Sequence, residues 1–251
     1  MEIRKSAFQT PITIKESIEA LHRKKYLLPA IQREFVWDPE QIIRLFDSLM
    51  RGYTIGSFLF WNVSKEKTRD FQFYEFVREY HERDNTHNPK ANITGEENIT
   101  AILDGQQRLT ALYIALKGTY AYKIPKKRWG NDDAFPKRKL YLNLASKSDE
   151  FDLLYNFSFL TVEEASKKDE NHFWFEVGMV IEFESLRDIN RFLREHDLIE
   201  SEFAEKCLFN LYEVITEHRA INYYLETSQK LDKVLNIFIR VNSGGTQLSY
   251  S

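Results

Sequence analysis

The chain has 251 residues, 43% of them hydrophobic and 14% aromatic, with a formal net charge of −3. This composition predicts a globular protein of one large or two modest domains and argues against a protein that coats nucleic acid by bulk charge. The single cysteine, Cys207, excludes an internal disulfide. The chain also lacks an apolar run long enough to span a membrane and a signal peptide at its start, so we expect a cytoplasmic protein.

The first elements alternate between helices and extended segments. A capping box of Thr13 and Glu16 predicts a short helix. Residues 27–37 are irregular and rich in large apolar groups, which indicates an extended or looped segment. The Asp-Pro-Glu-Gln sequence at 38–41 is a strong helix start, with a cap and a proline at the first helical position. Residues 53–61 then have the composition of a strand.

The most informative stretch is Asp104-Gly105-Gln106-Gln107-Arg108, between a short apolar run and a segment with helical spacing. We therefore expect it at a junction from strand to helix, where unpaired N–H groups and the helix dipole favour an anion. Gly105 would let the backbone approach closely. Arg108 offers a charged fork, and Gln106 and Gln107 offer neutral donors. The stretch is typical of a phosphate-binding turn.

The same residues also allow a structural interpretation. In that alternative Asp104 is the helix N-cap, Gln107 completes a capping box, and Arg108 is an ordinary surface charge. The two interpretations are compatible, because a capped helix start can still bind an anion once Asp104 turns toward a metal or solvent. The spacing alone leaves both open.

A locally basic stretch follows, from residue 117 to residue 139. Eight basic residues against Asp132 and Asp133 give it a charge of +6, and aromatic residues lie among them. Nucleic-acid surfaces use this mixture of cations and rings, but a solvated, charged loop has the same composition. If the stretch contacts DNA or RNA, the candidate DNA-binding residues are Lys123, Lys126, Lys127 and Arg128.

The rest of the chain is predicted to be mainly helical. Residues 140–144 have strand character, so we place a domain boundary after them, with a first domain at 1–144 and a mainly helical region at 145–251. Apolar residues recur at helical spacing over 186–196 and 201–218.

Strand character returns at 220–225, and a last amphipathic helix stops at Ser243-Gly244-Gly245. The final residues look like the approach to a helix cap with no helix following. We therefore expect the chain to be a piece of a longer protein.

Three segments together resemble the N-terminal domain of GmrSD-type restriction endonucleases. They are LPAIQREFVW at 28–37, DGQQRLT at 104–110 and FIRVNSGG at 238–245, and GYTIG at 52–56 also fits the pattern. The resemblance implies an α+β fold, with a ParB/sulfiredoxin-like N-terminal domain followed by the helical region. It also implies a role in prokaryotic defence against phage DNA that carries modified bases or backbones.

The resemblance associates the Asp-Gly-Gln-Gln-Arg segment with nucleotide binding and hydrolysis, with a nucleoside triphosphate and Mg²⁺ as cofactors. Asp104, Gln107 and Arg108 would then be catalytic, and Asp104 would also position the metal. The nucleotide-binding residues that it implies are Gln32, Arg33, Gly105, Gln106, Arg240 and Asn242. From the residues alone, the segment with Arg240 and Asn242 is equally an ordinary glycine-capped helix end, and Trp37 and Trp61 are either pocket or core residues.

The expected function is an Mg-dependent nucleotide hydrolase domain of a modification-dependent restriction system. The alternative is a module that senses a nucleotide or modified DNA without hydrolysis. The chain has no clustered His and Asn residues of the HNH nuclease type. Nuclease activity is therefore expected in a missing C-terminal domain or a partner subunit. The other expected partners are the nucleotide and modified or unmodified DNA, and no membrane.

Overall fold

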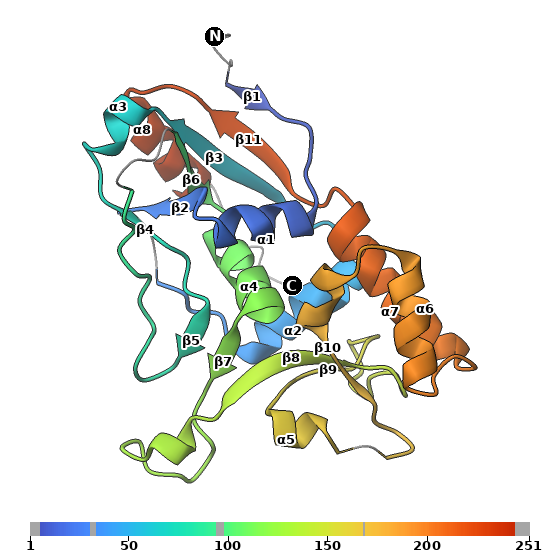
Figure 1. Ribbon diagram of the computed structural model, residues 1–251. Coiled ribbons are helices and arrows are strands. Elements are labelled where there is room, and N and C mark those ends of the chain that lie inside the picture. Colours follow the sequence, from blue (N-terminus) through green and yellow to red (C-terminus); the bar gives the residue numbers. More distant parts are fainter. Residues whose placement is uncertain (1–5, 31–33, 94–97, 168, 244–251) are drawn as a thin grey trace, which may run out of the picture.

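The computed structural model describes the chain except for residues 1–5, 31–33, 94–97, 168 and 244–251. The described part combines two sheets with helices, which confirms the α+β fold class (Figure 1). The helices are α1 (Ile14–His22), α2 (Pro39–Met50), α3 (Lys65–Thr68), α4 (Gln106–Lys117), α5 (Val162–Ala165), α6 (Leu186–Glu195), α7 (Glu202–Tyr212) and α8 (Leu231–Ser243), with the short helical turns η1 (Asp132–Ala134), η2 (Val177–Glu182) and η3 (Glu213–Glu217).

The first sheet contains both parallel and antiparallel pairs. β11 runs parallel to β3, β3 antiparallel to β6, and β6 parallel to β2. The strand order is β1 (Ala7–Phe8), β11 (Asn222–Glu226), β3 (Ser57–Val63), β6 (Ile99–Asp104), β2 (Tyr26–Pro29) and β4 (Phe73–Tyr74).

The second sheet is antiparallel except for one pair. β5 and β7 run parallel, whereas β8 runs antiparallel to β7, β9 and β10. Its strands are β10 (Trp174–Glu176), β8 (Lys137–Asn143), β7 (Thr119–Ala121) and β5 (Glu79–His81) in that order, with β9 (Phe157–Leu160) also paired to β8.

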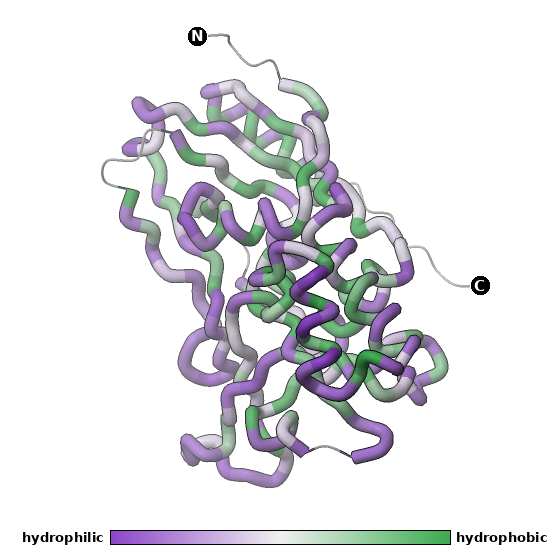
Figure 2. The backbone as a smooth tube through the Cα atoms, turned by 45° about the vertical axis from the view of Figure 1, so that its right-hand side comes forward, coloured by the Kyte–Doolittle hydropathy of each residue, from purple (hydrophilic) through white to green (hydrophobic). Residues whose placement is uncertain are grey.

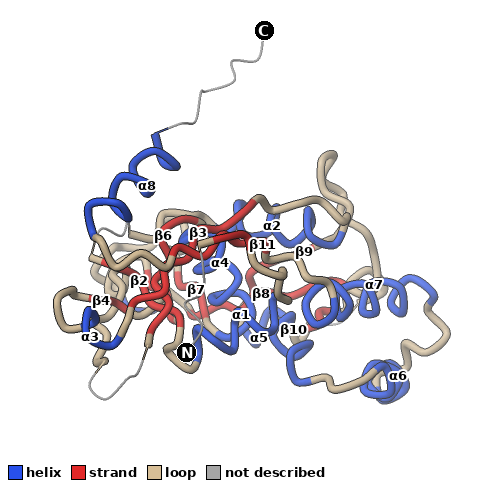
Figure 3. Tube along the Cα trace, turned by 90° about the horizontal axis from the view of Figure 1, so that it is seen from above, coloured by secondary structure: helices blue, strands red, loops and turns tan. Residues whose placement is uncertain are grey.

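The first sheet is buried on both faces. Along β3, Phe58 and Phe60 belong to the larger core cluster, while Leu59, Trp61 and Val63 belong to a separate cluster that includes side chains of α8. This period of two is the geometry of a strand, and burial on both faces explains why its sequence is almost continuously apolar. Figure 3 shows α1 and α8 on opposite sides of this sheet.

Helix α4 lies between the two sheets (Figure 1). All eight residues from Leu109 to Leu116 are buried, and all of them except Thr110 share one core cluster with Leu140 and Leu142 of β8. A helix that is apolar all round belongs in the interior of a protein. Hydrophilic segments lie mainly on the outside, as in the loops at the end of the molecule opposite the N-terminus (Figure 2).

Local sequence signals set the predicted helix starts. Thr13 with Glu16 and Asp38 with Gln41 form complete capping boxes, as predicted. The predicted helix at 201–218 continues from α7 into η3. The predicted strand at 53–61 begins only at Ser57, because Gly52 and Gly56 have positive φ angles of +76° and +77°.

The predicted division at residue 144 stays a prediction. The described part of the region after it contains three strands, and one of them, β11, lies within the first sheet between β1 and β3.

Glu226 joins three segments at the end of β11. Its side chain is 1% exposed and accepts hydrogen bonds from the Ser6 hydroxyl at 2.7 Å, the Ser228 N–H at 2.7 Å and Lys233 of α8 at 3.2 Å. Burial pushes the pKa of Glu226 upward, but these bonds to the charged carboxylate outweigh it, and the pKa lies below its ordinary value.

We expect Glu226→Gln to lower the free energy of unfolding at neutral pH. Because the folded pKa is depressed, the carboxylate stabilises the fold above the ordinary glutamate pKa of about 4.3, and this stability is lost as the pH falls through the folded pKa. The variant should therefore lose stability less steeply in acid. Urea unfolding between neutral and acid pH checks this, with Glu200→Gln as an exposed control; identical pH profiles for Glu226→Gln and the parent would contradict it.

Candidate functional site

Strand β6 and helix α4 meet at Asp104 and Gly105, where the sequence predicts a junction. Asp104 is the last residue of β6, and Gly105 is the N-cap of α4 with a φ angle of +88°. A Cβ at Gly105 would lie 2.1 Å from Cδ1 of Phe58, so both backbone angle and space require glycine here. The turn is therefore built on a left-handed glycine.

The predicted capping box at this helix start is wrong. The N-cap is Gly105, and no side chain forms a cap hydrogen bond there. Gln107 instead bonds two backbone groups of the segment before α2, donating to the Glu34 carbonyl at 2.7 Å and accepting from the Val36 N–H at 3.0 Å. The helix start thus keeps the backbone arrangement and dipole that favour an anion.

Arg108 is held by the segment that leads into β3. It donates to the carbonyls of Ile55 and Ser57, and its guanidinium carbon lies 4.3 Å from the centre of the Phe58 ring. Nη2 also lies 3.4 Å from the Asp104 carboxylate. The side chain is 21% exposed, and burial lowers the pKa of Arg108 from its usual value while Asp104 acts in the opposite direction.

These contacts connect two of the sequence segments that suggested the family resemblance. Gly56 makes room for the guanidinium, since a Cβ there would lie 2.9 Å from Nη1 of Arg108. Arg108 has five N–H donors, and its three described hydrogen bonds leave some of them for another acceptor. The guanidinium is therefore already partly used in holding the site together.

A pocket of about 140 Å³ opens at this junction. All five residues of the Asp-Gly-Gln-Gln-Arg segment line it, together with Trp37, Leu103 and Phe238. Trp37 therefore contributes to the pocket, whereas Trp61 lies in the core. Sequence reasoning missed Phe238 as a pocket residue, because its helical spacing indicates only a buried stripe.

Other predicted nucleotide-binding residues are placed only in part. Gln32 and Arg33 lie outside the described residues, although the Glu34 carbonyl next to them accepts the bond from Gln107. Arg240 lies on α8 with its side chain exposed. Asn242 is in the last turn of α8, but its side chain is not described. Gln106 donates to the Ile102 carbonyl at 2.9 Å.

The predicted metal ligand, Asp104, is 31% exposed and lies at the pocket. Within the described residues no group of three or more His, Cys, Asp or Glu side chains is arranged to hold a metal ion. Mg²⁺ commonly uses one or two carboxylates together with phosphate oxygens and water. A single carboxylate beside an anion-favouring helix start therefore fits Mg²⁺ that arrives with a phosphate ligand.

The predicted DNA-binding residues lie in the loop between β7 and β8, on a different part of the molecule from α4's start (Figure 1). Lys126, Lys127 and Arg128 are exposed, and Lys123 is half-buried. The described part of the chain has no helix that is long and apolar enough to cross a membrane.

Comparison with known proteins finds two matches. A sequence model for the family described as "GmrSD restriction endonuclease, N-terminal domain" matches residues 14–251. An uncharacterized protein from Methanocaldococcus jannaschii is 28% identical over 238 residues, which cover 92% of this chain and 39% of that protein. The chain thus spans well under half the length of this relative.

We expect Arg108→Ala to destabilise the protein as well as to alter the pocket. It removes charged hydrogen bonds to two carbonyls and the contact with the Phe58 ring, so the free energy of unfolding should fall by roughly 2–3 kcal/mol. Chemical denaturation measures this, and Arg187→Ala, which removes an exposed arginine of α6, is the control. Equal stability of the two variants would show that the Arg108 contacts contribute nothing to the fold.

Proposed function

Because the chain belongs to the family of the GmrSD restriction endonuclease N-terminal domain, we propose that the pocket at the start of α4 binds and hydrolyses a nucleoside triphosphate. In this proposal the chain is the nucleotide-hydrolysing part of a prokaryotic, modification-dependent restriction system. DNA and a nuclease domain or subunit are its proposed partners, since the matched relative continues well beyond the aligned region.

One observation carries the proposal. The uncapped start of α4 opens into a pocket that all five residues from Asp104 to Arg108 line. Backbone N–H groups, a helix dipole, a carboxylate and a guanidinium therefore lie around one small space. This is the set of groups that a phosphate chain and its metal ion require.

The pocket's size limits what it holds. Its 140 Å³ is below the roughly 300–1,000 Å³ of pockets that enclose whole drug-sized ligands. We infer that it takes the phosphate chain, while the base and sugar extend toward Trp37. The aromatic side chains of Trp37 and Phe238 offer apolar surface at that rim.

The chain's own groups have distinct roles in this mechanism. The first N–H groups of α4 bind and orient the terminal phosphates, and Asp104 would hold Mg²⁺ together with phosphate oxygens or orient the attacking water. When bound, Mg²⁺ would neutralise charge on the phosphates. Arg108 adds positive charge beside Asp104 and fixes its position. Phosphoryl transfer depends mainly on such positioning and charge, so no activated protein nucleophile is required.

A second function is favoured by the contacts of Gln107 and Arg108. Both side chains bond backbone groups of other segments, near Glu34 to Val36 and near Ile55 to Ser57. An anion that competes for these side chains would change the position of both segments. The pocket would then act as a nucleotide or modified-DNA sensor without hydrolysis.

We expect Asp104→Asn to abolish Mg-dependent phosphate release while the protein remains folded. The substitution keeps the size of the side chain and an oxygen near Arg108 but removes the charge that a metal ion needs. Phosphate release from the four ribonucleoside triphosphates, with and without DNA, measures the effect. Asp70→Asn, at an exposed aspartate, is the matched control.

Release that continues unchanged in Asp104→Asn would exclude the proposed role of Asp104. Nucleotide binding without release in the parent protein would instead support the sensor. Isothermal titration with a non-hydrolysable triphosphate separates the two, because we expect the parent to bind it in either case. A folded parent protein that neither binds nor hydrolyses any nucleotide would contradict both the hydrolase and the nucleotide sensor.

A further inference from the structure

The loop between β7 and β8, residues 122–136, projects from the second sheet at one end of the molecule (Figure 1). Its tip presents Lys126, Lys127, Arg128 and Trp129, which are all exposed. The indole of Trp129 is 51% exposed, with one edge packed against Phe135 at 5.2 Å between ring centres. An exposed indole directly after three basic residues is unusual for an ordinary solvated loop.

Two consecutive turns shape this tip. The Lys127 N–H bonds the Ile124 carbonyl at 3.3 Å, and the Asn131 N–H bonds the Arg128 carbonyl at 3.1 Å. Lys126 lies at the third position of the first turn with a φ angle of +67°, where glycine or asparagine is normally preferred. Lys126 therefore has a strained backbone conformation at the third position of this turn.

The basic side chains of the loop divide into two groups. Lys123 Nζ bonds the carbonyls of Ile124 and Lys127, and Lys127 Nζ bonds the Asp133 carbonyl at 3.0 Å. These two lysines hold the loop together. The side chains of Lys126 and Arg128 form no hydrogen bond or ion pair with any residue that the structure describes, so their charges remain available.

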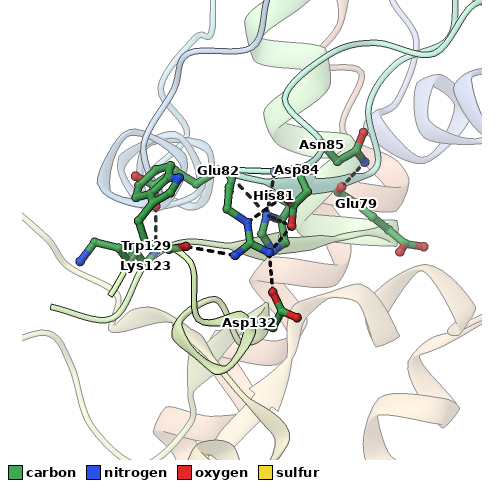
Figure 4. A network of polar contacts seen from close by, with 9 residues as sticks. Glu79, His81, Glu82, Asp84, Asn85, Lys123, Trp129 and Asp132 are labelled. Atoms are coloured by element: carbon green, nitrogen blue, oxygen red, sulfur yellow. Dashed lines mark hydrogen bonds and ion pairs between the residues drawn. The ribbon is translucent and has the colours of Figure 1, made fainter. Parts of the chain in front are cut away.

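Arg83 fixes the loop to the end of β5. It lies 2.7 Å from Asp84 and from Asp132, donates to the Trp129 carbonyl at 3.0 Å, and lies 4.9 Å from the centre of the Phe135 ring. Figure 4 shows this network, with Asp132 and Trp129 on the loop side and Asp84 on the other. Arg83 thereby neutralises two of the acidic groups next to the tip.

Acidic groups do remain near the tip. Glu82 accepts from the Lys123 N–H at 2.7 Å, and Asp133 is exposed in the loop. They lie beside the turn that Lys123 and Lys127 stabilise, and no acidic residue occurs between Lys123 and Gly130. The tip itself is thus positively charged.

We propose that Lys126, Arg128 and Trp129 form a contact site for single-stranded or locally opened DNA. The two cations bind phosphates, and the exposed face of the indole stacks on an unpaired base, as in proteins that bind single strands without sequence preference. The choice of DNA over RNA rests on the proposed restriction function. The contact itself follows from the loop alone.

The first experiment compares binding of a labelled oligodeoxynucleotide of roughly 16 nucleotides at several salt concentrations. Lys126→Glu/Arg128→Glu should weaken binding at low salt and reduce the slope of log K against log salt by about 1.4, because each single-strand phosphate contact contributes about 0.7. Lys65→Glu/Arg187→Glu makes the same charge change at two exposed helix starts, α3 and α6, and should leave the slope unchanged.

Two single variants separate DNA contact from loop stability. Lys126→Gly removes the cation but suits the positive φ angle, so it should weaken binding while thermal stability stays equal or rises. Trp129→Ala should weaken binding by roughly 5- to 100-fold, and Trp129→Phe should restore much of this because a ring can still stack.

Unchanged affinity in Lys126→Gly and in Lys126→Glu/Arg128→Glu would overturn the proposal, as would an equal loss in the Lys65/Arg187 control. Tighter binding of an RNA of the same sequence would overturn the assignment to DNA. Equal affinity for duplex and single strand, with no effect of Trp129→Ala, would overturn the stacking contact. Asp104→Asn should bind the oligonucleotide like the parent, so a failure of the hydrolase proposal leaves this test intact.

Discussion

The burial of helix α4 on every side is the constraint on which the rest of the structure depends. A helix whose interior residues are nearly all apolar must be enclosed, and here one face of the first sheet, the second sheet and neighbouring helices enclose it in a single core cluster. Its interior residues therefore expose very little surface to solvent. Only the ends of α4 reach solvent. The positive end of the helix dipole and the free backbone N–H groups lie at its first turn, which lines the pocket.

The side chains of that first turn attach the helix to its surroundings. Gln107 bonds the segment before α2, and Arg108 bonds the segment before β3. A polar motif at a helix start can thus have a structural role as well as the proposed chemical one, because the side chains proposed to meet an anion also connect three segments. The hydrogen bonds of Gln107 and Arg108 thus hold the pocket's surroundings together.

The sequence predicts well the features of this fold that depend on neighbouring residues. It predicts poorly the features that depend on residues far apart in the chain. Capping boxes at Thr13 and Asp38 and the strand-turn-helix around Gly105 depend on neighbouring residues, so their signals are visible in the sequence. The insertion of β11 beside β3 and the bonds of Gln107 depend on residues far apart in the chain. Likewise, the basic composition of the β7–β8 loop indicates a charged surface, but it does not reveal that Lys123 and Lys127 bond to carbonyls within the loop.

The position of β11 between β1 and β3 has a consequence for how the molecule assembles. β1 begins at residue 7 and β3 at residue 57, whereas β11 begins at residue 222, so among the described strands β1 joins the sheet through one that follows much later in the sequence. Pairing across such a sequence separation is slow, because the entropy of a long loop is lost before the contact forms. During synthesis the first sheet therefore stays incomplete, with the edge of β3 exposed, until β11 has left the ribosome.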